Sequence, residues 1–336
     1  MKTRRDARGA VLIFVLALVA LLASLAVQTL RTAQVEVFGA YSGIYARQAQ
    51  ATAESGLLAA AAVLLDNAKS QVSDNLTQDW ALFPDLTGYP GAWFLAGHIS
   101  GRIVDESGKF PVNSLHPGLA DHAVFEGIFL RLLTREPFSL SDDQAKSLLG
   151  ALVDWLDPDD KPGASGAEDS YYAAASLPYQ VRNNSLDTLA ELLLVKGFSR
   201  PLLYGQGDVP GLLSMLTLWG SGLINVNTAP LPVLAALPAD QTGSGGATLA
   251  AALDAYRRDP VRREELSTLE WLDKASGSQT VEWPQGALAT RSLYFSVQLE
   301  GRSGAAVRRL YAVLKRDSGR QSSKGPSCKV LYRELH

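Results

Sequence analysis

The densest group of chemically capable side chains in this sequence is acidic. Six carboxylates lie within sixteen residues: Asp154, Asp157, Asp159, Asp160, Glu168 and Asp169. Carboxylates this close repel one another unless water solvates them or a cation bridges them. Oxygen ligands without histidine or cysteine favour Ca²⁺ over zinc or copper, and the prolines and glycines between them allow a turn that gathers several oxygens. The residues alone leave two interpretations open: a calcium site, or a solvated acidic turn after a helix.

The acidic segment is not an EF-hand loop, although part of the pattern matches. Asp157, Asp159 and Glu168 fall at the first, third and twelfth places of such a loop. Lys161 and Pro162 occupy the fifth and sixth places, where the loop needs a ligand and a glycine. A calcium site here would therefore have its own geometry.

Other kinds of chemistry find little support in the sequence. The four histidines are scattered, and none forms an HExxH motif. Nucleophile elbows, Walker loops and dinucleotide-binding fingerprints are absent from the sequence, so we predict a protein that is not an enzyme. The single cysteine, Cys328, excludes an intrachain disulfide and cysteine-based zinc sites. A formal net charge of -3 disfavours a nucleic-acid partner.

The elements that would position the acidic segment begin with a membrane anchor. Residues 10–27 carry no charge, and four basic residues precede them: Lys2, Arg4, Arg5 and Arg8. Such a run is close to the roughly 20 residues that cross a bilayer, and the basic flank places the N-terminus in the cytoplasm. The bulk of the chain should then face the periplasm. A cleaved signal peptide is the alternative.

The anchor should continue outward as one long helix through residue 68, because no proline interrupts residues 28–69. Its outer part carries small and apolar residues at three- and four-residue spacings: Ala49, Ala53, Leu57, Ala60 and Leu64. This stripe is typical of a helix that packs on a globular head. We call this outer helical part the spine.

The N-terminus resembles that of type IV pilins and pseudopilins, in which basic residues, Arg8-Gly9 and then Ala10-Val11-Leu12-Ile13 precede a long apolar helix. The resemblance implies that prepilin peptidase cleaves, and methylates, at Gly9/Ala10. Most members have glutamate at the fifth mature position, where this chain has Phe14. Absence of that glutamate is characteristic of the K subunit of type II secretion pseudopilins, which looks like a tip subunit.

The region beyond the spine shows both strand and helix patterns. Residues 98–105 alternate as a strand, and residues 292–300 and 307–316 read as a hairpin around Gly301 to Gly304. Helical spacing occupies much of the chain between them, at residues 123–134, 141–156, 186–195, 209–219, 229–237 and 247–257. We predict an α+β fold: a long N-terminal helix on an antiparallel, pilin-like sheet, with a large inserted all-helical domain.

The resemblance to the K pseudopilin family supplies domain limits. It implies a leader (1–9), a transmembrane helix and spine (10–68), a first part of the head (69–115), an inserted helical domain (116–220), a second part of the head (221–316) and a flexible tail (317–336). The segments 151–160, 166–172 and 178–183 are similar to the inserted domain of that family, which is reported to hold calcium. We take Asp157, Asp159, Asp160, Glu168 and Asp169 as the candidate calcium ligands.

An internal repeat adds a competing hypothesis. Residues 107–114 parallel residues 221–228, and Asn113 and Asn225 with the Ser or Thr that follows could cap the next helix. The second copy also resembles the opening of a helix-hairpin-helix, a DNA backbone-binding unit, but Leu237-Pro238 is not followed directly by the glycines that unit needs.

The function that the resemblance implies is that of a minor pseudopilin at the tip of a periplasmic pseudopilus, in a system that exports folded proteins across the outer membrane. Implied partners are minor pseudopilins I, J and H, major pseudopilin G and prepilin peptidase, with the secretin and secreted substrates as further contacts. The alternatives are a membrane-anchored DNA receptor, a type IV pilus minor pilin and a membrane-anchored hydrolase. No catalytic motif in the sequence supports the hydrolase.

Overall fold

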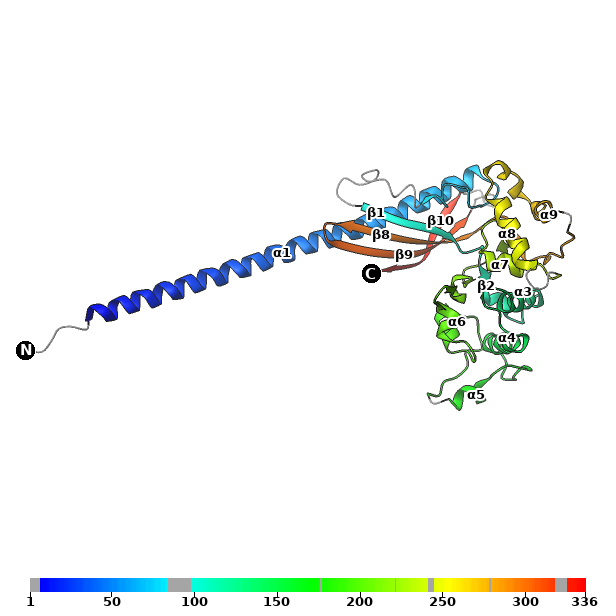
Figure 1. The fold of residues 1–336 in the computed structure, drawn as a ribbon, viewed down its shortest axis with the longest axis horizontal. Coiled ribbons are helices and arrows are strands. Elements are labelled where there is room, and N and C mark those ends of the chain that lie inside the picture. Colours follow the sequence, from blue (N-terminus) through cyan, green and yellow to red (C-terminus); the bar gives the residue numbers. More distant parts are fainter. Residues whose placement is uncertain are drawn as a thin grey trace, which may run out of the picture.

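The computed structural model describes residues 7–83, 98–175, 177–220, 222–240, 245–277, 279–317 and 325–336. Figure 1 shows one long helix, a sheet lying along its C-terminal part, and a separate lobe at the end of the helix farthest from the N-terminus. The helix α1 (Ala7–Ser70) has 64 residues, which makes it about 95 Å long. It is exposed throughout residues 10–45. Among the described residues it is the one helix long and apolar enough to cross a membrane.

The sheet covers the predicted spine. Four antiparallel strands lie in the order β1 (His98–Asp105), β8 (Tyr294–Ser303), β9 (Ala306–Asp317) and β10 (Ser327–Leu335). All five residues of the stripe read from the sequence are buried, and four of them share a core with Phe295, Val297 and Leu299 of β8. At Gly301 a Cβ atom would lie 2.2 Å from the carbonyl oxygen of Ala49. The helix can therefore approach the sheet this closely only over a glycine.

The C-terminal end corrects the sequence prediction of a flexible tail at 317–336. Residues 327–335 form β10, which pairs antiparallel with β9 through a register shift between Val330 and Tyr332. Cys328 and Leu335 pack against the core under the sheet. β10 forms at this edge because β9 offers unpaired backbone groups to it, which the local composition does not reveal. Residues 318–324, which contribute most of the glycine and serine, lie outside the described residues.

The lobe between β1 and β8 is mainly helical. Its α-helices are α3 (His122–Thr134), α4 (Asp142–Leu156), α5 (Asp169–Ala173), α6 (Arg200–Tyr204), α7 (Leu231–Ala236), α8 (Gly245–Arg257) and α9 (Trp271–Ser276). Short 3-10 helices join them: η1 (Val112–Leu115), η2 (Leu189–Leu193), η3 (Leu212–Ser214), η4 (Pro260–Arg262) and η5 (Glu265–Ser267). The predicted helices at 123–134, 141–156 and 247–257 are confirmed, each within two residues at either end.

The lobe is not all-helical, because three pairs of short strands also occur in it. These are β2 (Phe110–Pro111) with β5 (Leu216–Thr217), β3 (Gly205–Gln206) with β4 (Val209–Pro210), and β6 (Ile224–Asn225) with β7 (Leu288–Ala289). The predicted helix at 209–219 is wrong: this stretch contains β4, η3 and β5. At Gly211 a Cβ would lie 2.3 Å from the carbonyl oxygen of Leu203, so the chain turns back on α6 there. The predicted helix at 186–195 is reduced to η2.

The hydrophobic cores divide the chain differently from the predicted domain limits. One core runs from Phe110 to Ala287 and includes Ile224, Val233 and Leu253. The other joins α1 to the four-stranded sheet. The described residues between 222 and 288 therefore pack with the lobe rather than with the head, because β6 pairs with β7 and α7 packs in the same core as α3. The core of the lobe therefore runs from Phe110 to Ala287, beyond both predicted limits of 116 and 220.

The internal repeat has a tertiary role. The predicted capping by Asn113 and Asn225 is wrong, because Asn113 instead accepts from the backbone nitrogen of Leu186 and donates to its carbonyl oxygen. Asn225 binds residues of the head. In the helix-hairpin-helix comparison, α7 and α8 exist, but residues 241–244 between them lie outside the described residues.

Candidate metal centre

The acidic segment is presented by the end of α4. Ser141 caps the helix by accepting from the backbone of Gln144, whose side chain bonds back to Ser141. One face of α4 buries Leu148, Leu152 and Trp155 in the lobe core. The helix ends at Leu156 because Pro158 disfavours helical geometry at the residue before it. This places Asp154 on the last turn and Asp157 at the C-cap.

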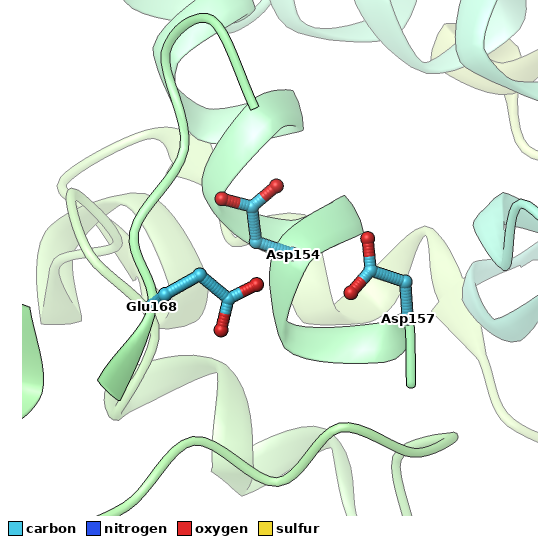
Figure 2. Close-up of side chains that lie close together, drawn as sticks. All are labelled: Asp154, Asp157 and Glu168. Carbon is cyan, nitrogen blue, oxygen red and sulfur yellow. The ribbon is translucent and has the colours of Figure 1, made fainter. Parts of the chain in front are cut away.

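Three carboxylates converge where the chain returns toward α4. Asp154, Asp157 and Glu168 each offer a carboxylate oxygen, and these oxygens all lie within 4.8 Å of one another. Glu168 is the residue before α5, on the returning segment, and Figure 2 shows its carboxylate turned toward the end of α4. Asp154 is 3% exposed and Glu168 is 2% exposed. A cation that prefers oxygen ligands could bind all three carboxylates at once.

Several of these oxygens have no hydrogen-bond partner among the described residues. Both carboxylate oxygens of Glu168 and Oδ1 of Asp157 are buried and unpaired. Leaving a buried carboxylate oxygen unpaired carries a large desolvation cost. Asp154 is better satisfied, since its carboxylate accepts from the backbone nitrogen of Gly163 at 3.1 and 3.2 Å. The unpaired oxygens match the donor set of a hard cation, so the residues fit calcium.

The loop between α4 and α5 is built to approach the carboxylates. At Gly166 a Cβ would lie 1.7 Å from Oδ2 of Asp154, so no side chain fits there without displacing the carboxylate. Lys196 donates to the carbonyl oxygen of Gly166 at 3.0 Å and lies over the Tyr171 ring. The ammonium group of Lys196 thus holds the loop in place.

Burial and mutual repulsion dominate the electrostatics of the group. Burial, followed by repulsion from Asp154 and Asp157, raises the pKa of Glu168 to about 7. Burial is also the largest cause that raises the pKa of Asp154 and of Asp157. A divalent cation would reverse this effect, since positive charge favours the ionised carboxylates.

The structure brings together only part of the predicted ligand set. Asp157 and Glu168 belong to the group, and Asp154, which was not among the predicted ligands, joins them. The other three carboxylates are engaged locally: Asp159 accepts from the nitrogen of Lys161, Asp160 from Asn183 and Asp169 from the nitrogen of Val181. The three-residue spacing of Asp154 and Asp157 at a helix end was the available signal, because it places both side chains on one face.

Asn183 is a further residue that the sequence reasoning did not select as a ligand. Its backbone has a positive φ of 50°, which asparagine tolerates better than most residues. Its amide nitrogen donates to Asp160 Oδ1 and to the carbonyl oxygen of Asp159. Its Oδ1 is buried and has no partner among the described residues. The amide nitrogen of Asn183 therefore holds the acidic turn in place, and its Oδ1 adds one more unpaired buried oxygen to this turn.

At the other end of the molecule, the predicted cleavage position lies at the start of α1. The backbone of Gly9 and Ala10 is helical, while residues 1–6 of the leader lie outside the described residues. Phe14 is 71% exposed on α1, within the apolar stretch. Whether peptidase cuts between Gly9 and Ala10 stays a prediction.

Comparisons with known proteins agree on one family. The family model described as type II secretion system protein K matches residues 108–204. The type II secretion system protein K of Pseudomonas aeruginosa is 31% identical over 243 residues, which is 70% of this chain and 69% of that protein. That of Pectobacterium carotovorum is 29% identical over 211 residues, covering 60% of this chain and 61% of that protein.

A solved structure has the same fold. A chain of the GspK-GspI-GspJ complex from the enterotoxigenic Escherichia coli type 2 secretion system matches with a TM-score of 0.59 and 18% identity. The match covers 90% of this chain and 99% of that chain. The two chains therefore share their fold over most of their length.

Proposed function

Because the chain belongs to the type II secretion system protein K family and is a minor pseudopilin, we propose that it forms the tip of a periplasmic pseudopilus and supports export of folded proteins across the outer membrane. The family is one of structural pseudopilins, and the chain acts by assembly rather than by catalysis. It is anchored in the inner membrane by α1, with its N-terminus in the cytoplasm and its head and lobe in the periplasm. The basic residues before the apolar stretch support this orientation.

The main support for a tip position is the location of the lobe relative to α1. α1 ends at Ser70, and the lobe extends beyond and beside that end, on the side away from the N-terminus (Figure 1). Because α1 is the proposed anchor, its N-terminal end points toward the membrane, and a subunit added above this one would have to share the space of the lobe. The lobe leaves the exposed length of α1 free to contact neighbours below.

The apolar Phe14 supports the same position. In most pilins the residue at the fifth mature place is a glutamate thought to pair with the N-terminal amine of a neighbouring subunit. Burying such a carboxylate in lipid is costly unless it is paired. A tip subunit has no neighbour above it, and Phe14 removes the cost along with the contact.

The proposed partners are the minor pseudopilins I and J, with H and the major pseudopilin G below them, and prepilin peptidase for maturation. The structural match to a chain from a GspK-GspI-GspJ complex supports I and J. Gold labelling of an epitope placed after His336, on sheared pseudopili, tests the position. A label at one end of each filament is expected, and labels spaced along the shaft would rule out a tip subunit.

We also propose that the lobe binds Ca²⁺ through Asp154, Asp157 and Glu168. Their unpaired buried oxygens support this choice. Asp159, Asp160 and Asp169, which the sequence suggested, would then shape the loop. Bound calcium would neutralise the carboxylates and fix the segment between α4 and α5 against the lobe core.

A further inference from the structure

The chain passes between head and lobe at two adjacent buried carboxylates. β1 of the head ends at Asp105, and Glu106 begins the connection to the lobe. The chain returns to the head through residues 290–293, just before β8. Asp105 is 6% exposed and Glu106 is 3% exposed, although both are acids. Buried carboxylates persist only where hydrogen-bond donors surround them. The residues that donate to Asp105 and Glu106 therefore show which parts of the chain these carboxylates connect.

Asp105 joins the returning segment to the lobe. Its Oδ2 accepts from the hydroxyl of Ser292, which precedes β8, and from the hydroxyl of Thr228 in the lobe at 2.6 Å. The amide of Asn225, in β6 of the lobe, donates to the same oxygen at 3.2 Å. The backbone nitrogen of Ser107 donates to Oδ1 of Asp105 at 2.8 Å.

Glu106 makes a matching connection to different residues. Its Oε1 accepts from the hydroxyl of Ser296, in β8, at 2.6 Å. Its Oε2 accepts from the hydroxyl of Thr217, in β5 of the lobe, at 2.7 Å. Lys109 pairs with Oε1 at 2.6 Å. Each carboxylate therefore binds one serine on the head side and one threonine on the lobe side.

β1 ends at Asp105, but Glu106 continues its pairing with β8, because its backbone nitrogen donates to the carbonyl oxygen of Tyr294 at 2.9 Å. The two side chains therefore point to opposite faces, and so do the two connections. A single connection would leave the lobe free to rotate about the two linkers. Connections on both faces oppose rotation in either direction. Hydrogen bonds to a charged group are stronger than neutral ones, and breaking them inside the protein leaves a buried charge unsatisfied.

A buried ion pair extends this arrangement to the spine. Asp74 and Arg316 pair at 2.5 Å, and each side chain is 1% exposed. Asp74 Oδ2 also accepts from the backbone nitrogen of Ser292 at 2.8 Å, and Arg316 donates to the carbonyl oxygen of Leu64 in α1 at 3.4 Å. Asn225 of the lobe donates to the carbonyl oxygen of Asp74 at 3.2 Å. The residues that hold the lobe thus contact the end of the long helix.

We propose that Asp105 and Glu106, with Ser292, Ser296, Thr217 and Thr228, form a two-sided junction lock that makes lobe, sheet and spine one rigid body. The lobe then keeps a fixed orientation relative to α1 and moves with it.

The test uses the full chain in detergent micelles, with Cys328→Ser and spin labels at two exposed positions. One label replaces Leu58, which lies on α1 and is 73% exposed, and the other replaces exposed Lys146 on α4. The pulsed-EPR distance distribution is measured in the parent chain and in the Thr217→Val/Thr228→Val variant, which removes the lobe-side hydroxyl from both faces. The matched control is Thr134→Val, which makes the same chemical change in the lobe at a hydroxyl that bonds within its own helix, to the carbonyl oxygen of Leu130.

The junction lock predicts a single narrow distribution in the parent chain and the control, and a broadened or split one in the junction variant. Either single variant, Thr217→Val or Thr228→Val, should stay closer to the parent, since the connection on the other face remains. An Asp105→Ala/Glu106→Ala variant, in which hydrogen exchange of α3 and α4 reports that the lobe is still folded, should broaden further. A distribution in the double threonine variant equal to that of its control overturns the proposal, as does a broad distribution in the parent chain.

Discussion

Replacing Glu168 by glutamine should separate calcium binding from a merely acidic surface, because the two effects of this change have opposite signs. Glutamine keeps the size of the side chain and removes its charge. Without calcium, the buried carboxylate destabilises the folded lobe, since burial and the neighbouring carboxylates raise its pKa to about 7. With calcium, the same carboxylate is a proposed ligand. Glu168→Gln should therefore stabilise the metal-free protein and abolish the stabilisation that calcium gives.

The size of the first effect follows from the pKa. A folded-state value raised from 4.5 to about 7 means that the folded protein holds this proton more tightly than the unfolded chain does. The contribution of the protonated Glu168 side chain to the free energy of unfolding is fully present below pH 4.5 and is lost as the pH rises through about 7. At pH 8 the complete loss amounts to at most about 3 kcal/mol, which is the largest gain that Glu168→Gln can give in chelator.

The second effect follows from mass action. Calcium at a hundredfold excess over its dissociation constant stabilises the wild-type fold by about 2.7 kcal/mol. For a lobe of this size, each kcal/mol shifts the melting temperature by roughly 2 to 4 °C. Both effects are measurable by differential scanning calorimetry at pH 8, in chelator and at calcium concentrations up to the millimolar range typical of extracytoplasmic sites.

Asp160→Asn is the matched control, since Asp160 lies outside the group of three carboxylates and binds Asn183 instead. It should keep the calcium response, whereas the ligand set predicted from the sequence requires its loss. Equal wild-type melting temperatures in chelator and in millimolar calcium would refute calcium binding. A Glu168→Gln protein that is less stable than wild type in chelator at pH 8 would refute the electrostatic reasoning.

Three further changes test the anchor and the head. Gly9→Val should block prepilin peptidase, so mass spectrometry of the membrane-extracted variant should find the uncut leader. The wild-type protein should begin at Ala10, and a start near Gln28 would instead mean signal-peptide cleavage. Phe14→Glu places a carboxylate in the apolar stretch and should impair secretion by a deletion strain carrying this variant, while normal secretion would show that Phe14 does not determine the tip role. Gly301→Val should cost about 1 to 3 kcal/mol in urea unfolding, because its Cβ would meet the backbone of Ala49, and an unchanged midpoint would contradict that close approach.

Local patterns were sufficient where an element carries its own signal. The alternating pattern of β1, the capped α4 and the β8–β9 hairpin were all predicted, because short-range periodicity and turn residues specify them. β10 was missed, since glycine and serine dominate the sequence before it and a register shift at Val330 and Tyr332 breaks its alternation. The stretch at 209–219 was predicted as a helix, because its partner strand β2 lies about a hundred residues earlier and no local pattern reveals that pairing.

The candidate site shows the same division. The sequence located the acidic segment, and two of the predicted ligands, Asp157 and Glu168, do converge; that the cation is calcium stays a prediction. It did not select Asp154, because that choice depends on where the loop returns. Gly166 permits that return by lying against the Asp154 carboxylate, a contact between positions twelve residues apart.

Assembly with the other minor pseudopilins tests the central claim most directly. The full chain, tagged after His336, is co-expressed with pseudopilins I, J, H and G and purified from detergent-solubilised membranes, and the mass of the eluted complex is measured by native mass spectrometry. The proposed tip role predicts a complex that contains one copy each of this chain, I and J, and that forms without H or G. Recovery of this chain alone, or in strings of its own copies, would contradict it.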